Sequence, residues 1–295
     1  MGPQPANRDV ALPVQRIHIR YAKRGRLRFS SHRDFQRAFE RALRKAEIPM
    51  AYSAGFNPRP KVSYANAAPT GTASEAEYLE ISVVKHCDPD QVAAALDAAL
   101  PVGLDVVEAV EVRISDLAHR LEASLWEIDL RGVDPVEVAR AVATLLDAKR
   151  VEVSRLTKNG VRTFDARGPI LTMWLDADNR PPGHQDEEPD SGARARSDGD
   201  REDQPEVRSD DSPGQAGTRG VPAEADSCAI LQVVVRQVTP AVRPDDVLTA
   251  LTQLADLVLP VPPVVTRRAQ GPLAPDARSV LDPLAPDRSG AAVGT

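Results

Sequence analysis

The sequence predicts an α+β protein in which one order of strands and helices occurs twice, and three observations lead to this prediction. Segments that alternate apolar with polar residues, as half-buried strands do, are interleaved with segments that carry apolar residues at helical spacing. The order strand, helix, strand, strand, helix, strand can be written once in each half of the chain. Stretches rich in proline, glycine and charge carry neither pattern and are expected to be disordered, because they cannot offset the entropy cost of ordering. These stretches are residues 1–13, 178–227 and 271–295.

The first unit is expected over residues 14–114. Apolar side chains alternate with arginine and histidine over residues 15–21, which predicts a half-buried strand followed by a turn at residues 23–26. After a first helix, the remaining elements are predicted as strands over 61–67 and 78–84, a helix over 89–100 and a strand over 104–112.

The first helix is predicted to begin after Ser31, where the apolar period changes from two to about 3.6 residues. Ser31 is the expected N-cap, with Asp34 three residues on. Phe35 and Phe39 share the apolar face and are expected in the core, as is Phe29 just before the helix. The opposite face carries Arg33, Arg37, Arg41 and Arg44.

The second unit is expected over residues 115–270. Its predicted elements are strands over 125–130, 151–155, 171–175, 229–237 and 264–268, with 162–165 as an additional candidate, and helices over 135–147 and 244–257. Residues 178–227 hold 14 acidic and 6 basic residues, so we expect them to be an acidic insertion that links two strands outside the core. Both units then follow β-α-β-β-α-β, which predicts two tandem ferredoxin-like units, the second interrupted by this insertion.

Charge is distributed unevenly along the chain. Residues 14–64 contain 13 Lys and Arg against 3 Asp and Glu, a net charge of +10, so the rest of the chain sums to −16 within the total of −6. The same segment holds seven of the eleven aromatic residues. A one-signed surface of this kind indicates a partner of opposite charge, whereas a solvated helix face, the ordinary alternative, mixes both signs.

Arginine in this segment points to phosphate, because its planar fork donates paired hydrogen bonds and its face stacks on a base. Aromatic side chains in the loop before the second strand would stack on unpaired bases, the mode by which proteins read single-stranded RNA. The predicted RNA-binding residues are Arg24, Arg26, Arg28, His32, Arg33, Arg37, Arg41, Arg44, Tyr52, Phe56, Arg59 and Lys61. Among them, His32 is also the only catalytic candidate, as an acid or base in RNA cleavage.

Other classes of protein are not indicated. Cys87 and Cys228 are isolated, so neither a disulfide framework nor a metal site is expected. There is no Walker sequence, no Gly-x-Gly-x-x-Gly and hence no expected cofactor. No apolar run approaches the roughly 20 residues that cross a bilayer, and no secretion signal opens the chain, so we expect a cytoplasmic protein without a membrane partner.

Three segments carry a recognisable pattern. They are Lys-Arg-Gly-Arg-Leu-Arg-Phe-Ser-Ser-His at 23–32, Ala-Tyr-Ser-Ala-Gly-Phe-Asn-Pro-Arg-Pro-Lys at 51–61 and Gly-Thr-Ala-Ser-Glu-Ala-Glu-Tyr at 71–78. Through them, residues 14–176 resemble the radical-SAM-linked domain of unknown function, the DUF2344 family. The resemblance implies association with a radical SAM enzyme and no established activity. Because the chain lacks Cys-x-x-x-Cys-x-x-Cys, it would be the accessory half of such a pair.

These patterns together favour a non-catalytic RNA-binding accessory protein associated with a radical SAM enzyme, acting in tRNA or rRNA modification. Two alternatives remain open. One is a metal-independent endoribonuclease that uses His32, since a duplicated ferredoxin-like arrangement with a basic face also resembles CRISPR RNA-processing endoribonucleases. The other is a protein–protein adaptor whose basic face docks the radical SAM enzyme without RNA.

Overall fold

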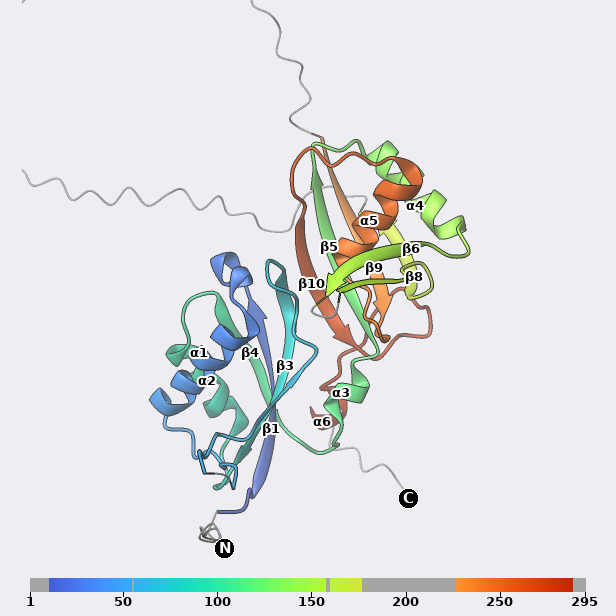
Figure 1. Cartoon of the computed structure of the whole chain (residues 1–295). Helices are drawn as coiled ribbons and strands as arrows, with labels where there is room; N and C mark the ends of the chain where they lie inside the picture. Colours follow the sequence, from blue (N-terminus) through green and yellow to red (C-terminus); the bar gives the residue numbers. More distant parts are fainter. Residues whose placement is uncertain (1–10, 55, 158–159, 177–226, 289–295) are drawn as a thin grey trace, which may run out of the picture.

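The computed structural model describes residues 11–54, 56–157, 160–176 and 227–288, which form an α+β fold (Figure 1). The predicted α+β class is therefore confirmed. Of the segments predicted to be disordered, residues 1–10, 178–226 and 289–295 lie outside the described part of the chain.

The N-terminal half follows the predicted order of elements. They are β1 (Gln15–Lys23), the 3-10 helix η1 (Gly25–Phe29), α1 (His32–Lys45), β2 (Val62–Ala65), β3 (Ala73–Val83), α2 (Pro89–Ala99) and β4 (Leu104–Glu111). The predicted N-cap is confirmed, because the Ser31 side chain accepts a hydrogen bond from the Asp34 N–H. Strand β3 begins at Ala73 rather than at residue 78, because the carboxylates of Glu75 and Glu77 pair with arginines within the fold.

The C-terminal half contains an additional hairpin. Its elements are α3 (Leu117–Arg120), β5 (Ala123–Arg131), α4 (Pro135–Asp147), β6 (Glu152–Thr157), β7 (Gly160–Asp165), β8 (Ile170–Leu175), β9 (Cys228–Arg236), α5 (Pro244–Ala255) and β10 (Val264–Gly271). Asp134 caps α4 by accepting a hydrogen bond from the Val136 N–H at 2.8 Å, as its position before the apolar period predicts. Strands β6 and β7 pair only with each other among the described residues and form a separate two-stranded sheet.

The other described strands make one mixed sheet. In the N-terminal half the strands lie in the order β4-β1-β3-β2, and in the C-terminal half in the order β10-β5-β9-β8, with antiparallel neighbours throughout. The two halves join where β3 and β10 run parallel, through the pairs Thr266–Ala73 and Arg267–Ser74. Each half thus repeats the same strand order, and a short parallel contact makes the sheet continuous.

Each face of the N-terminal sheet has its own cover. Helices α1 and α2 lie side by side on one face (Figure 1) and form a core with β1 and β3 that includes Phe39, Leu43 and Leu96. The opposite face is covered by α3 and by the chain after β10, which meet in a small cluster around Leu121 and Leu284. In the C-terminal half, α4, α5 and the β6–β7 hairpin enclose a second large core.

The segment after β10 corrects the sequence prediction. Residues 271–295 were expected to be disordered, but residues 272–288 are ordered and end in α6 (Ala285–Arg288). Leu284 is 0% exposed and Asp287 is 2% exposed. The segment is rich in proline and charge, which predicts disorder. Its ordered conformation depends on partners more than 100 residues away, which local composition does not indicate.

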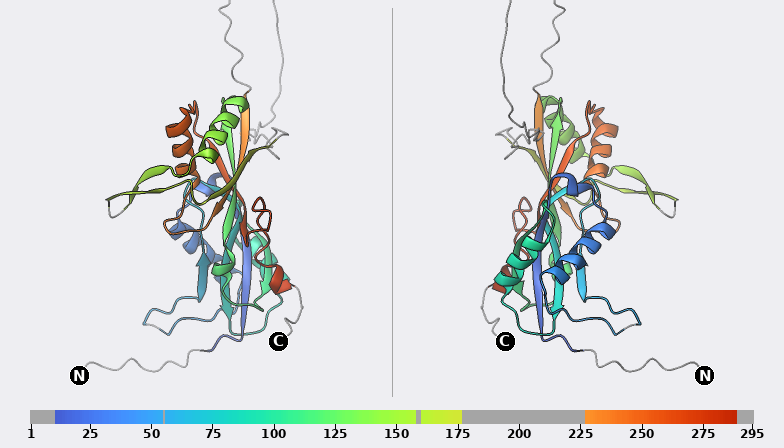
Figure 2. Two further views of the ribbon diagram at one scale, coloured as in Figure 1. Left: turned by 90° about the vertical axis from the view of Figure 1, so that its right-hand side faces the viewer. Right: turned by 90° about the vertical axis from the view of Figure 1, so that its left-hand side faces the viewer.

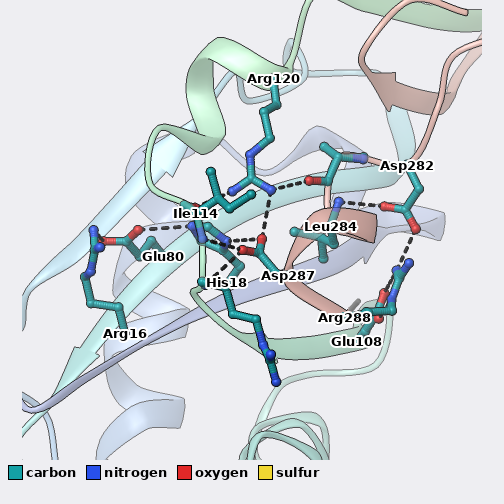
Figure 3. A network of polar contacts seen from close by, with 12 residues as sticks. Arg16, His18, Glu80, Glu108, Ile114, Arg120, Asp282, Leu284, Asp287 and Arg288 are labelled. Carbon is teal, nitrogen blue, oxygen red and sulfur yellow. Dashed lines mark hydrogen bonds and ion pairs between the residues drawn. The ribbon is translucent and has the colours of Figure 1, made fainter. Parts of the chain in front are cut away.

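Asp287 is the centre of those partners (Figure 3). Its carboxylate accepts hydrogen bonds from the backbone N–H groups of Arg113 and Ile114 at 3.0 Å each and from Nη1 of Arg120 at 2.8 Å. It also lies 3.0 Å from Nδ1 of His18, whose Nε2 lies 3.0 Å from Glu80. His18 is fully buried, so this network fixes the C-terminal segment against β1.

A second buried network joins the two halves of the sheet. The guanidinium of Arg267 on β10 pairs with the carboxylate of Glu77 on β3, and the two side chains are 3% and 2% exposed. Arg267 also donates to the Asn66 carbonyl at 2.8 Å and lies 5.4 Å from the centre of the Trp126 ring. Glu77 accepts a further hydrogen bond from the Ala68 N–H at 3.1 Å. Where the two halves meet, each buried charge therefore has a partner only when both Arg267 and Glu77 are present.

We expect Arg267→Met to lower the free energy of unfolding by about 3–5 kcal/mol, because it leaves the Glu77 carboxylate buried without its partner. Urea denaturation measures this loss. As a matched control, Arg150→Met removes an exposed pair with Glu152 and should cost less than about 1 kcal/mol. Equal losses in the two variants would contradict the role given to the buried pair.

Asp287 should make stability depend on pH. Burial opposes its ionisation, but hydrogen bonds from the Ile114 N–H, the Arg120 guanidinium and the Arg113 N–H outweigh burial, so its pKa lies below the ordinary value of 3.8. The stability that this carboxylate contributes is therefore complete above its unfolded-state pKa and is lost as the pH falls through its folded-state pKa. Urea midpoints of the wild type and Asp287→Asn should differ most at neutral pH and converge on acidification. A difference that stays constant down to pH 3 would be inconsistent with this carboxylate as the cause.

Candidate functional site

Helix α1 separates its side chains into two faces. Phe35, Phe39, Ala42 and Leu43 are buried, which confirms the predicted core face. The four arginines of the opposite face, Arg33, Arg37, Arg41 and Arg44, are all exposed. Because their spacing follows the helical period, the four guanidinium groups lie along one side of the helix. We call these four residues the basic face.

The guanidinium groups of the basic face are not used within the fold. Within the described part of the chain, none of the four joins an ion pair, and the same holds for Arg26 and Arg59. Arg24 differs. Its Nε donates to Glu75 at 2.8 Å and its Nη1 donates to Asp105 at 2.8 Å, so its charge is neutralised by two carboxylates. The structure thus separates Arg24 from the other predicted RNA-binding arginines.

The segment before α1 brings cations to its first turn. None of the residues of η1 is buried, and Arg26 and Arg28 lie in its last turn. The prediction that Phe29 belongs to the core is wrong, because the short 3-10 helix leaves the ring 59% exposed. The Arg28 guanidinium lies over this ring, 4.7 Å from its centre.

Residues 52–54 and 56–61 form a hairpin-like arm that projects from the sheet (Figure 2). Tyr52 pairs with Pro60, and the Ser53 N–H donates to the Arg59 carbonyl at 2.9 Å. Below them, the Lys61 N–H donates to the Ala51 carbonyl at 2.8 Å. These contacts fix the base of the arm.

The arm presents aromatic surface to solvent. Phe56 near its tip is 91% exposed and Tyr52 at its base is 40% exposed. Arg59 and Lys61 on its returning segment are exposed as well. The structure therefore brings aromatic rings and cations of the predicted set together on one segment.

His32 occupies the first position of α1 and is exposed. Its Nε2 lies 3.0 Å from the amide nitrogen of Gln36, and its ring meets the Tyr64 ring edge-on at 5.1 Å. Among the described residues, no carboxylate or cationic side chain hydrogen-bonds to the imidazole. General acid–base catalysis normally needs a group that orients or protonates the histidine, and this arrangement supplies only an amide.

No pattern in the sequence indicates the polar centre that lies beneath the first turn of α1. Lys23 is 6% exposed, and its Nζ lies 3.4 Å from the Ala68 carbonyl and 3.3 Å from that of Pro69. Burial lowers the pKa of this amine, although the nearby Glu77 carboxylate opposes the shift. Lys23 and Glu77 lie in strands whose alternation predicts only a buried and an exposed face, so their proximity became visible only in the fold.

No set of three histidine, cysteine, aspartate or glutamate side chains among the described residues is placed to hold a metal ion. No helix in the described ranges has the length and apolar character to cross a membrane.

A protein-family model described as "Uncharacterized protein conserved in bacteria (DUF2344)" matches residues 16–196, more than half of the chain. The chain belongs to the DUF2344 family. The family expected from the three sequence segments is thus confirmed. The DUF2344 match begins in β1, includes the basic face and the arm, and ends before β9. A search of the curated proteins found no match to the chain.

Two phenylalanines of this DUF2344 protein should respond oppositely to truncation. Phe56→Ala should leave the free energy of unfolding within about 0.5 kcal/mol of wild type, because the ring is almost fully exposed. Phe39→Ala should cost about 3–5 kcal/mol, since it opens a cavity in the core below α1. Thermal and urea unfolding of both variants test this. A large loss in Phe56→Ala would show that the ring has a structural role.

Proposed function

We propose that this DUF2344 protein is a cytoplasmic, non-catalytic accessory protein that binds RNA through the basic face and the arm. One observation carries the proposal. The guanidinium groups of Arg33, Arg37, Arg41 and Arg44 share one exposed side of α1 without a carboxylate partner among the described residues. A concentrated field of one sign attracts a polyanion, and RNA phosphate is the polyanion that the arginine fork fits.

The exposed aromatic rings of the arm favour RNA as the partner over a purely charged partner such as an acidic protein surface. Tyr52 and Phe56 present rings to solvent, where apolar exposure has no structural benefit. Aromatic rings beside cations are the usual platform for unpaired bases, each stacked base being worth about 1–3 kcal/mol. The chemistry of the surface therefore favours RNA with an unpaired segment.

We further propose that the fold consists of two tandem ferredoxin-like units. The equal strand orders β4-β1-β3-β2 and β10-β5-β9-β8 support this, as do α1 and α2 between strands of the first unit and α4 and α5 between strands of the second. The β6–β7 hairpin would then be an insertion between the first helix and the second strand of the C-terminal unit. In this arrangement the RNA-binding surface belongs entirely to the first unit.

The partner that acts on the RNA is proposed to be a radical SAM enzyme, on the ground of the sequence resemblance. The chain contains two cysteines, Cys87 and Cys228, and therefore cannot supply three thiolates to a cluster. Its role would be to hold an RNA, such as a tRNA or rRNA, while the partner carries out the modification.

RNA affinity should depend steeply on salt, because phosphate contacts release counterions. For single-stranded RNA each lost contact lowers the slope of log affinity against log salt by about 0.7, so replacing all four arginines of the basic face by glutamine should lower it by up to about 3. Fluorescence anisotropy over a range of salt measures the slope. The matched control replaces Arg140, Lys149 and Arg150, which are exposed in the C-terminal half, and should leave the slope unchanged.

Two other results would replace this proposal. RNA cleavage by the wild type that disappears in His32→Ala, with affinity retained, would identify the protein as an endoribonuclease. A wild type that binds no RNA even at low salt, yet captures a radical SAM protein, would identify a protein–protein adaptor. If the variant that lacks the four arginines of the basic face binds RNA as tightly as the wild type, the RNA is bound by another surface.

A further inference from the structure

A cavity of about 190 Å³ lies between the C-terminal end of α1 and the base of the arm. It borders both parts of the proposed RNA-binding surface, because Arg44 of the basic face and Tyr52 of the arm both line it. The volume is several times the share of about 30 Å³ that one water occupies in the liquid, which leaves room for a planar ring. A ligand in this cavity would therefore lie directly beside any phosphate held by Arg44.

The inner walls of the cavity are apolar. Leu43 and Met50 are 2% and 5% exposed, and the half-buried side chains of Ile48 and Pro60 complete this surface. Tyr52 adds an aromatic ring at the rim. Surfaces of this kind accept the face of an unpaired base.

Two carboxylates, Glu40 and Glu47, line the cavity. They differ from Glu75, Glu77 and Glu80 on β3, which each pair with an arginine. By contrast, Glu40 and Glu47 accept no hydrogen bond and join no ion pair among the described residues, although Arg44 lines the same cavity. Unpaired carboxylates beside a phosphate-binding face weaken its field, so they are expected to meet a ligand group that donates hydrogen bonds.

The position of Glu47 strengthens this expectation. It follows α1 with a φ of 53°, in the left-handed region that usually holds glycine at the end of a helix. The helix end is closed there by a hydrogen bond from the Ile48 N–H to the Leu43 carbonyl at 3.1 Å. A glutamate in this conformation costs free energy that glycine would not, and within the described part of the chain its carboxylate accepts no hydrogen bond in return.

We infer that this cavity binds one unpaired guanine of an RNA. Guanine presents two adjacent N–H donors on its Watson–Crick edge, N1–H and the N2 amino group, which match the two oxygens of one carboxylate. Adenine and cytosine present an amino group beside an acceptor, and uracil presents a single N–H between two acceptors. Tyr52 would stack on the base and Arg44 would hold its phosphate. The inference rests on the proposed RNA binding and adds base preference to it.

The test compares four seven-nucleotide RNAs, each a run of uridine with guanosine, inosine, adenosine or uridine at the centre. Fluorescence anisotropy at one low salt concentration gives the affinities. The wild type should bind the guanosine RNA about tenfold more tightly than the adenosine RNA, which corresponds to one bidentate base contact. The inosine RNA, which lacks the N2 amino group, should lie between them.

The double variant Glu40→Gln and Glu47→Gln should lose this discrimination. It should also bind the uridine RNA more tightly than the wild type does, because two negative charges leave the phosphate-binding surface. Glu137→Gln, an exposed substitution in the first turn of α4, is the matched control and should change neither quantity.

The outcomes separate the two proposals. RNA binding of similar strength to all four oligonucleotides, or discrimination that survives in the double variant, would overturn the guanine site and leave the RNA-binding surface in place. Absence of binding to every oligonucleotide and to a structured RNA would overturn the RNA-binding function itself. Each variant should have the same thermal unfolding midpoint as the wild type, which ensures that the affinities are compared on folded protein.

Discussion

The buried ion pair between Arg267 and Glu77 is the interaction on which the continuity of the structure depends. Strands β3 and β10 share only two paired positions, too few to fix a parallel register by backbone hydrogen bonds alone. A shift of one residue would turn Arg267 to the other face of the sheet and leave two buried charges unpaired. The pair therefore selects one register between β3 and β10 and joins the two four-stranded arrangements into a single sheet.

The same polar centre extends to the proposed binding surface. Glu77 holds the Ala68 N–H, and Lys23 approaches the carbonyls of Ala68 and Pro69. A small cavity lined by Lys23, Glu77 and His32 lies between this centre and the first turn of α1. The start of the helix that carries the basic face thus lies beside the buried charges that also join the two halves.

The arginines of this protein fall into two groups that the net charge of −6 conceals. Several of those that meet the sheet or the C-terminal segment, among them Arg24, Arg120 and Arg267, have carboxylate partners. Those on the outer side of α1 have none among the described residues. Internal pairing removes charge from the surface selectively, so a positive region persists on an acidic chain and remains free to attract phosphate.

The sequence by itself determined the α+β class, the helices after Ser31 and Asp134, the core face of α1 and the family, because periodicity, capping and short motifs are local properties. Only the tertiary structure decided that Arg24 is neutralised, that Phe29 is exposed and that Glu40, Glu47 and the arm share a cavity. It also decided the order of residues 272–288, which depends on Asp287 reaching His18 across 269 positions of sequence. The reason is physical: the partners of a charged side chain are set by strand register and chain packing, and no local pattern of residues records which distant group will lie opposite.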